Sequence, residues 1–226
     1  MPEVEFICLA NSIKKGGRCI AGLRTNGEGW VRPVNPLTGS LYSHQYVLDN
    51  GRDIELLDIV KVSLQEPCPQ PYQPENWTLN NQPWHFVRQL SHSEAKSTIE
   101  SIIVSGPDLL GNQFDSVPQY SLEQNPVKAS LALIEPGELK WRITTNRYDR
   151  LQARACFTFG GCNYDLSITD PVWKERLTTS LPIGFHVVSD ADLPRRERLY
   201  FTISLGAPYR GSCYKLVAAV IVLPTA

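Results

Sequence analysis

Short runs in which apolar and polar residues alternate occupy much of the chain, and they predict strands joined by tight turns. The alternation is cleanest over residues 199–205, where every second residue is apolar. Such a period of two is typical of strands that bury one face of a sheet. The runs that predict strands are residues 6–10, 18–25, 30–34, 59–64, 84–90, 127–134, 139–145, 152–169 as a hairpin, 199–205 and 213–223.

Two segments predict helices instead. Residues 91–104 place Ala95 and Ile99 on one face, as in an amphipathic helix, with Ser93 as the expected N-terminal cap. Asp170-Pro171 predicts the start of a shorter helix, because a capping aspartate followed by proline favours a helix N-terminus. The segments expected to be irregular are residues 11–17, the proline-rich residues 66–74, and residues 106–126 as a linker or lid.

The hairpin at residues 152–169 has a register that both of its faces support. A two-residue turn at Gly160-Gly161 would pair Phe157 with Tyr164 on an apolar face. The same turn would pair Arg154 with Ser167 on a polar face. A slip by one residue would mix the two faces and is therefore disfavoured.

A second hairpin, around Asn26-Gly27, admits two registers. A two-residue turn would set Trp30 opposite Leu23 and bury Arg32. A three-residue turn would set Trp30 opposite Arg24, so that an exposed face would carry Arg18, Arg24, Trp30 and Arg32. We favour the second register, because burying an unpaired charge is costly.

The order of the elements predicts a mainly β fold built from two small barrels. The second half runs through three strands, a short helix and two more strands, which is the order of the five-stranded Greek-key barrel called the OB-fold. The first half begins with a similar three-strand meander, although no sequence repeat relates the halves. The expected division is residues 1–90, a helix and linker at 91–126, and residues 127–226. One larger mixed β barrel with a helical insertion is the alternative.

Composition limits which partners and which cellular compartment the sequence predicts. The net charge is −1, so binding of nucleic acid would depend on local basic patches rather than on the overall charge. No long apolar window predicts a membrane span, and the acidic start lacks the features of a signal peptide. We therefore expect a cytoplasmic protein with no membrane partner and with reduced cysteines. The cysteine spacings do not resemble a zinc site, so no metal or cofactor is expected.

Three stretches of the sequence resemble the dual OB-containing domain family. They are CLANSIKKGGRCIAG with GWVRPV near the start, YDLSITDP in the middle and ISLGAPYRGSCYKLVAAVI near the end. The resemblance implies two OB-like barrels, nucleic-acid binding, and a prokaryotic protein of mobile-element or anti-phage defence loci. It supplies no catalytic residues. The positions that match its motifs are Asn11, Ser12, Lys14, Gly17, Arg18, Trp30, Arg32, Asp170, Tyr209, Tyr214 and Lys215.

Basic residues interleaved with aromatic residues predict a surface that binds DNA or RNA without catalysis. Single strands bind OB-type barrels by stacking bases on aromatic rings and placing phosphates on Lys and Arg. One such cluster surrounds the Gly16-Gly17 turn, a second surrounds Tyr148, and a third lies near residue 210. The predicted binding residues are Asn11, Lys14, Lys15, Arg18, Arg24, Trp30, Arg32, Arg142, Tyr148, Tyr209, Arg210, Tyr214 and Lys215.

Two other functions compete with this hypothesis. A subunit of a larger complex could use the proline run, Trp77, Trp84 or residues 106–126 as contact surfaces. An enzyme acting on nucleotides or nucleic acid would need a nucleophile, an acid–base pair or a metal. The four histidines are scattered, and no phosphate-binding loop or nucleophile motif is present, so no catalytic residue is predicted.

Overall fold

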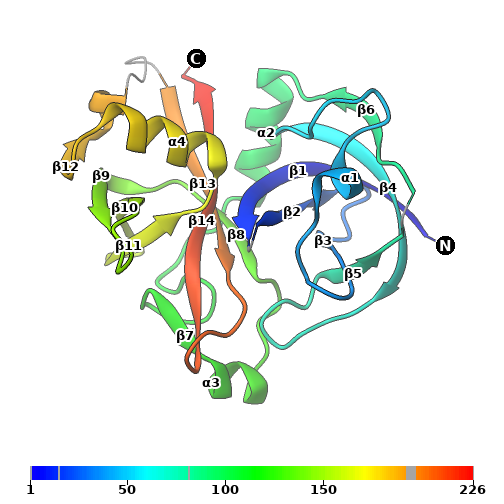
Figure 1. Cartoon of the computed structure of the whole chain (residues 1–226), viewed down its shortest axis with the longest axis horizontal. Coiled ribbons are helices and arrows are strands. Elements are labelled where there is room, and N and C mark those ends of the chain that lie inside the picture. Colours follow the sequence, from blue (N-terminus) through cyan, green and yellow to red (C-terminus); the bar gives the residue numbers. More distant parts are fainter. Residues whose placement is uncertain (1, 15, 81, 192–196, 226) are drawn as a thin grey trace.

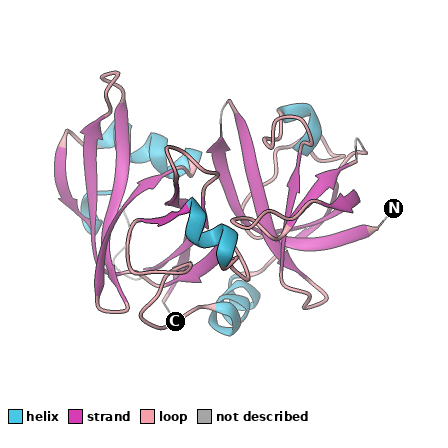
Figure 2. Ribbon diagram, turned by 90° about the horizontal axis from the view of Figure 1, so that it is seen from below, coloured by secondary structure: helices cyan, strands magenta, loops and turns pink. Residues whose placement is uncertain are grey.

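The strands form two barrels that lie side by side. The computed structural model describes residues 2–14, 16–80, 82–191 and 197–225. Helix α2 (His92–Ile102) follows the first barrel, and the strands separate into two groups in both views (Figures 1 and 2). The predicted mainly β fold with two OB-like barrels is therefore confirmed.

The first barrel closes in the strand order of an OB-fold. Its strands are β1 (Glu3–Lys14), β2 (Gly17–Arg24), β3 (Trp30–Val34), β4 (Asp58–Pro67) and β5 (Asn76–Leu79). The order is β1-β2-β3-β5-β4, and β4 pairs again with β1. The short helix α1 (Ser43–Tyr46) lies between β3 and β4, and β6 (His85–Gln89) adds to the free side of β4. Phe6, Ile20, Val31, Val60 and Trp84 fill the interior.

Strand β1 takes part in two pairings because it is long and bends. Its first residues pair with β4, and the stretch from Phe6 onward pairs with β2. Gly22 permits the close crossing, since a Cβ at that position would lie 2.0 Å from the carbonyl oxygen of Ile7. The predicted loop at residues 11–17 is wrong for its first part: β1 continues to Lys14. The backbone N–H of Ile13 also bonds to Thr169 O of the second barrel at 2.8 Å, which supports this extension.

The second barrel has the same order but divides its first strand in two. Its strands are β8 (Leu131–Ile134), β9 (Gly137–Thr145), β10 (Leu151–Phe159), β11 (Cys162–Ile168), β13 (Glu197–Leu205) and β14 (Ser212–Pro224). β8 pairs with β13 and β9 pairs with β10, so together they make the two pairings that β1 alone makes in the first barrel. The break falls at Glu135-Pro136, where proline has no N–H to donate to a ladder. Helix α4 (Pro171–Ser180) begins at the predicted Asp170 cap, and β12 (Gly184–Val187) adds to β9.

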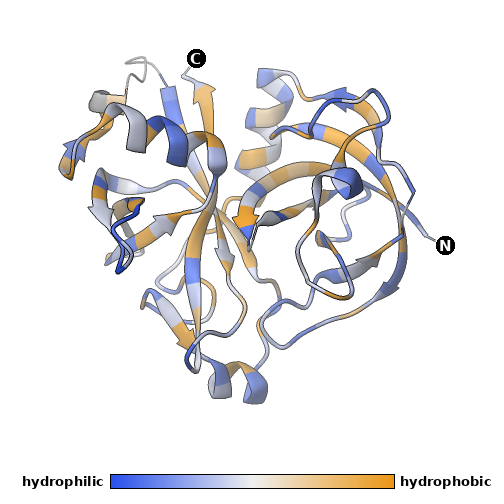
Figure 3. Cartoon of the chain, viewed as in Figure 1, coloured by the Kyte–Doolittle hydropathy of each residue, from blue (hydrophilic) through white to orange (hydrophobic). Residues whose placement is uncertain are grey.

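Apolar side chains from both barrels form a continuous interface. Ala21 of β2 packs with Leu131 of β8 and Ala218 of β14, and Trp30 packs against this cluster. A larger cluster joins Ile7 and Leu9 to Tyr200 and to residues of α2. Figure 3 shows the hydrophobic stretches of β1 and β14 beside each other at the centre of the molecule. The residues of β13 that alternate with its apolar ones, Tyr200, Thr202 and Ser204, face outward from the second barrel but are buried by the first barrel.

The favoured register of the first hairpin is wrong. Trp30 pairs with Leu23 and Val31 with Gly22, which is the register that buries Arg32. Arg32 is 1% exposed, yet its charge is paired: its Nη2 lies 2.9 Å from Oε1 of Glu75. The argument against an unpaired buried charge was sound. It led to the wrong register because Glu75, which follows the proline run, was not recognised as the partner.

The segment predicted as a linker has its own structure. It contains β7 (Ser116–Pro118), which pairs with β14, and α3 (Gln119–Gln124). A further stretch that the sequence left ambiguous forms β12 and the 3-10 turn Val188–Ala191. The domain boundaries at residues 90 and 126 remain a prediction.

The N-terminal cap of helix α2 lies two residues before the predicted one, which makes the start of the helix testable. Ser91, not Ser93, accepts the N–H of Glu94, and Glu94 bonds back to the N–H of Ser91. We expect Ser91→Ala to lower the free energy of unfolding by about 1 kcal/mol, because it leaves an amide of the first turn unsatisfied. Ser93→Ala is the matched control and should cost less than about 0.5 kcal/mol. Urea denaturation compares them, and equal losses would contradict the capping assignment.

Candidate nucleic-acid interface

A pocket of about 580 Å³ lies between the two barrels. We call it the inter-barrel pocket. One wall is the outer face of β10 and β11, a second comes from β1 to β3 of the first barrel, and a third comes from the ends of β13 and β14. In OB-folds the ligand face is the outer surface of the second and third strands with the loops at their ends, and β10 and β11 are these strands in the second barrel.

The β10–β11 wall carries a fixed group of charges. Nε of Arg154 lies 2.7 Å from Oδ1 of Asp165, and Nη1 of Arg142 lies 3.0 Å from Oδ2 of the same carboxylate. Arg154 also donates to the hydroxyl of Ser167 at 2.8 Å. Burial, together with the nearby charge of Asp165, raises the pKa of the Cys156 thiol to about 11. The thiol therefore stays protonated at neutral pH. The bonds to Asp165 and Ser167 hold the guanidinium of Arg154 in one orientation.

Lys215 anchors another part of the pocket. Its ammonium group donates to Asn112 O at 2.9 Å, to Asn112 Oδ1 at 2.8 Å and to Phe114 O. Burial of the side chain lowers the pKa of Lys215 to about 8. The backbone of Asp115 accepts the N–H of Lys215, and its carboxylate accepts the N–H of Asp165. Residues 112–115 thus close the gap between β11 and the start of β14.

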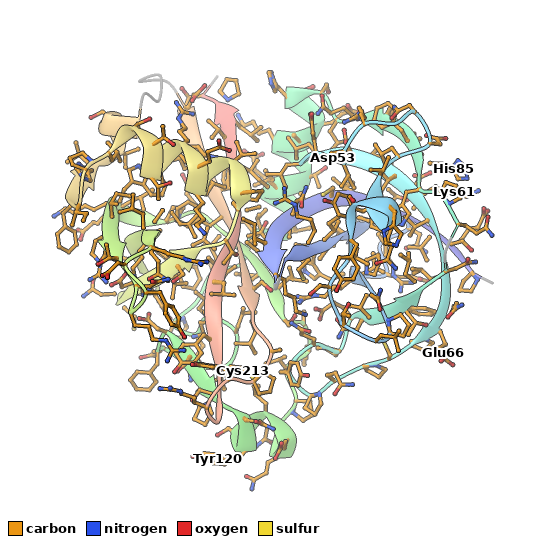
Figure 4. The ribbon with its side chains drawn as sticks, in the orientation of Figure 1. Asp53, Lys61, Glu66, His85, Tyr120 and Cys213 are labelled. Atoms are coloured by element: carbon orange, nitrogen blue, oxygen red, sulfur yellow. The ribbon has the colours of Figure 1, made fainter. Side chains whose placement is uncertain are left out.

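Two exposed tyrosines stand at the rim of the pocket. Tyr209 is 52% exposed and Tyr214 is 45% exposed, and their ring centroids are 6.5 Å apart. The guanidinium of Arg210 lies over the Tyr209 ring at 5.4 Å. These residues surround the turn between β13 and β14, which is close to Cys213 at the lower end of the molecule in Figure 4. Two neighbouring aromatic rings with a cation beside them suit a stacking ligand.

The wall from the first barrel combines a buried ion pair with a lysine at the edge. Arg32 bonds to the hydroxyls of Ser130 and Ser204 as well as to Glu75. Lys14 donates to Gly39 O at 3.1 Å and lines both this pocket and a neighbouring one of about 370 Å³. The two pockets therefore share a border at Lys14, at the edge of the first barrel.

The sequence from residue 4 to residue 220 matches the dual OB-containing domain family. The chain belongs to this family. The match covers both barrels and the segment between them. The sequence has no match among curated proteins.

In this dual OB-containing domain the second and third strands of the two barrels have different surroundings. The outer face of β2 and β3 in the first barrel is covered, because Ala21, Leu23 and Trp30 pack against the second barrel. The corresponding face of β10 and β11 borders the inter-barrel pocket. The exposed basic face predicted for the first hairpin does not form, because Trp30 packs against the second barrel and Arg32 is buried, whereas Arg24 lies over the Trp77 ring.

The structure brings only some of the predicted binding residues together. Lys14, Arg32, Tyr209, Tyr214 and Lys215 line the inter-barrel pocket, although Arg32 and Lys215 are buried and paired rather than exposed. Two more adjoin it: Arg142 through Asp165, and Arg210 through Tyr209.

The other predicted residues lie outside the inter-barrel pocket. Asn11 borders a third pocket and donates to Ile54 O at 3.0 Å. Arg24 lies over the Trp77 ring and pairs with Glu28, and Tyr148 is 66% exposed in the turn between β9 and β10. Arg18 pairs through its backbone with Leu41, and Trp30 is half-buried. Lys15 lies outside the described residues.

Sequence reasoning identified only part of the wall formed by β10 and β11, although its signal was present. The hairpin register predicted Arg154 opposite Ser167 and Cys156 opposite Asp165 on one polar face, and the structure confirms these pairs. Arg142 was predicted to bind nucleic acid as part of the cluster around Tyr148, whereas the pairing of Asp165 with both Arg142 and Arg154 was not predicted. Gln73 and Asp115, which come from distant segments, had no local signal.

One of the features that supported a competing function has another role in the structure. Trp84, expected as a contact surface, is fully buried and meets Phe6 edge-on with ring centroids 5.9 Å apart. No group of three or more histidine, cysteine, aspartate or glutamate side chains suited to a metal ion occurs among the described residues. None of the described helices has the length and apolar character needed to cross a membrane.

Proposed function

We propose that the chain is a non-catalytic module that binds single-stranded DNA or RNA at the inter-barrel pocket. The observation that carries the proposal is the position of this pocket, on the outer face of the second and third strands of the second barrel. This is the surface that OB-folds use for oligonucleotides. Tyr209 and Tyr214 at the rim supply aromatic rings of the kind on which bases stack.

The arrangement supports one binding site per chain. The equivalent face of the first barrel is packed against the second, so a strand has no access to it. Lys14 and Arg210 are the cations at the rim that we expect phosphates to contact, since the cations of the interior are buried. Placement in a prokaryotic defence or mobile-element system rests on the family resemblance and remains a prediction.

A salt titration with labelled oligonucleotides tests this function. We expect single-stranded DNA or RNA to bind with one site per chain and more tightly than a duplex of the same sequence. Each phosphate contact on a single strand contributes about −0.7 to the slope of log affinity against log salt, so two rim cations give a slope of about −1.4. Fluorescence anisotropy measures both quantities. Absence of binding to every DNA and RNA form at about 50 mM salt would overturn the proposal.

A further inference from the structure

The charged side chains inside the inter-barrel pocket are already engaged by protein groups. Arg32 is paired with Glu75, Arg154 is paired with Asp165, and Lys215 is surrounded by oxygen acceptors. The lining also carries the carboxylates of Asp115 and Asp165. A phosphate placed inside would lie beside these carboxylates and would have to compete with the groups that already bind the cations. The interior therefore favours a neutral group.

The walls of the pocket combine apolar surface with a few polar groups that remain available. Ile13 and Leu216 contribute apolar surface, and Tyr214 stands at the rim. The side-chain amide of Gln152 lines the same pocket and makes no hydrogen bond with the described residues. At about 580 Å³ the pocket falls in the range of small-ligand sites, which are mostly apolar with a few convergent polar groups.

The cations that could meet a phosphate lie at the border of the pocket. Lys14 lines the inter-barrel pocket and its neighbour together, and Arg210 is exposed beside Tyr209. A nucleotide would satisfy this pattern with its base inside and its phosphate at Lys14. The reverse orientation would bring the phosphate to Asp115 and Asp165.

We propose that the inter-barrel pocket holds one unpaired nucleobase, taken out of its strand, with the Gln152 amide on the edge of the base. The inference rests on the proposed function and deepens it by naming the group that enters the pocket. A nucleobase could come from a strand or from a free nucleotide, and the two sources share this chemistry. The experiment below separates them.

The test scans a short single strand with one modified position at a time. We expect an abasic site at one position to weaken binding roughly fivefold to a hundredfold, the range for loss of one stacked base, and the same change elsewhere to have a smaller effect. The fluorescent base 2-aminopurine at that position should change its emission on binding. Gln152→Ala should reduce the loss of affinity that an abasic site causes at the sensitive position. It should leave the slope of log affinity against log salt unchanged. Tyr120→Ala is the matched control, because Tyr120 is 65% exposed and does not line the pocket.

Each outcome separates this inference from the proposed function. If strands bind but every abasic position and every 2-aminopurine position behaves alike, the base pocket is wrong and strand binding stands. If strands do not bind but adenosine or guanosine monophosphate does, with loss of binding in Gln152→Ala, the base pocket stands and strand binding is wrong. Failure of both strands and mononucleotides to bind overturns both.

Discussion

Replacing Glu75 by glutamine is expected to lower the free energy of unfolding by about 3–5 kcal/mol, because it leaves the buried guanidinium of Arg32 without a counter-charge. Both side chains are almost inaccessible, at 1% and 5% exposure for Arg32 and Glu75. Glutamine has nearly the same shape as glutamate, so the loss reports the charge rather than a cavity. Chemical denaturation followed by tryptophan fluorescence measures the change.

The first hairpin offers a matched control for this prediction. Arg24 and Glu28 form an ion pair of 3.0 Å, but Glu28 is 63% exposed. Glu28→Gln should cost less than about 1 kcal/mol, since exposed ion pairs are weakened by water and salt. A Glu75→Gln protein that is as stable as Glu28→Gln would contradict the role assigned to the buried pair. If Glu75→Gln unfolds in two transitions and only one of them moves to lower denaturant, the effect of the pair is confined to one barrel.

The buried pair also connects stability to the site. The backbone N–H of Arg32 bonds to Glu75 O at 3.0 Å, which aligns β3 with the segment leading into β5. The carboxylate of Glu75 then accepts from the backbone and hydroxyl of Ser130 in the second barrel. Arg32 and Ser204 both line the inter-barrel pocket. The pair therefore fixes one wall of the pocket relative to the other barrel.

Local patterns predicted those elements whose partners are close in sequence. The β10–β11 hairpin was correct because both of its faces constrain one turn at Gly160-Gly161. The Asp170 cap was correct because the signal lies in two adjacent residues. The order of strands and helices was enough to predict two OB-like barrels.

Features that depend on contacts between distant segments could not be read from local patterns. Alternation in β13 predicts two faces, and it cannot show that the polar one meets another barrel. Thr202 shows why such a face can be buried, since its hydroxyl donates to Leu9 O across the interface. The site follows the same rule: Tyr209 and Lys14 were identified by residue type, whereas their meeting at one pocket depends on how the barrels pack.

Packing of the barrels also explains why a chain with two OB-like units is expected to have one site. Packing against the second barrel buries the outer face of β2 and β3 in the first barrel. The same packing places Lys14 and Arg32 in the lining of the inter-barrel pocket. The first barrel thus acts as a wall of the site rather than as a second binding surface. A stoichiometry of two strands per chain would contradict this division of roles.

Replacing both rim tyrosines, Tyr209→Ala with Tyr214→Ala, is expected to weaken binding of single strands at least about fivefold, and at least about 30-fold if each ring stacks its own base. Stacking of a base on an aromatic ring contributes about 1–3 kcal/mol, so loss of both rings removes about 2–6 kcal/mol if the effects add. The rings are 6.5 Å apart and can share one base, in which case the loss is that of one stacked base, about 1–3 kcal/mol. Fluorescence anisotropy at fixed salt measures the affinity.

Conservative replacements show whether the rings or the hydroxyls act. The double change to phenylalanine keeps both rings and should retain most of the affinity. A large loss of affinity in this variant would show that the tyrosine hydroxyls bind the ligand. Because both side chains are about half exposed, the alanine double variant should unfold at nearly the same denaturant concentration as the original protein. Its salt slope should also stay unchanged, since Lys14 and Arg210 remain. Undiminished binding by the alanine variant would mean that strands, if they bind, lie on a surface other than this rim.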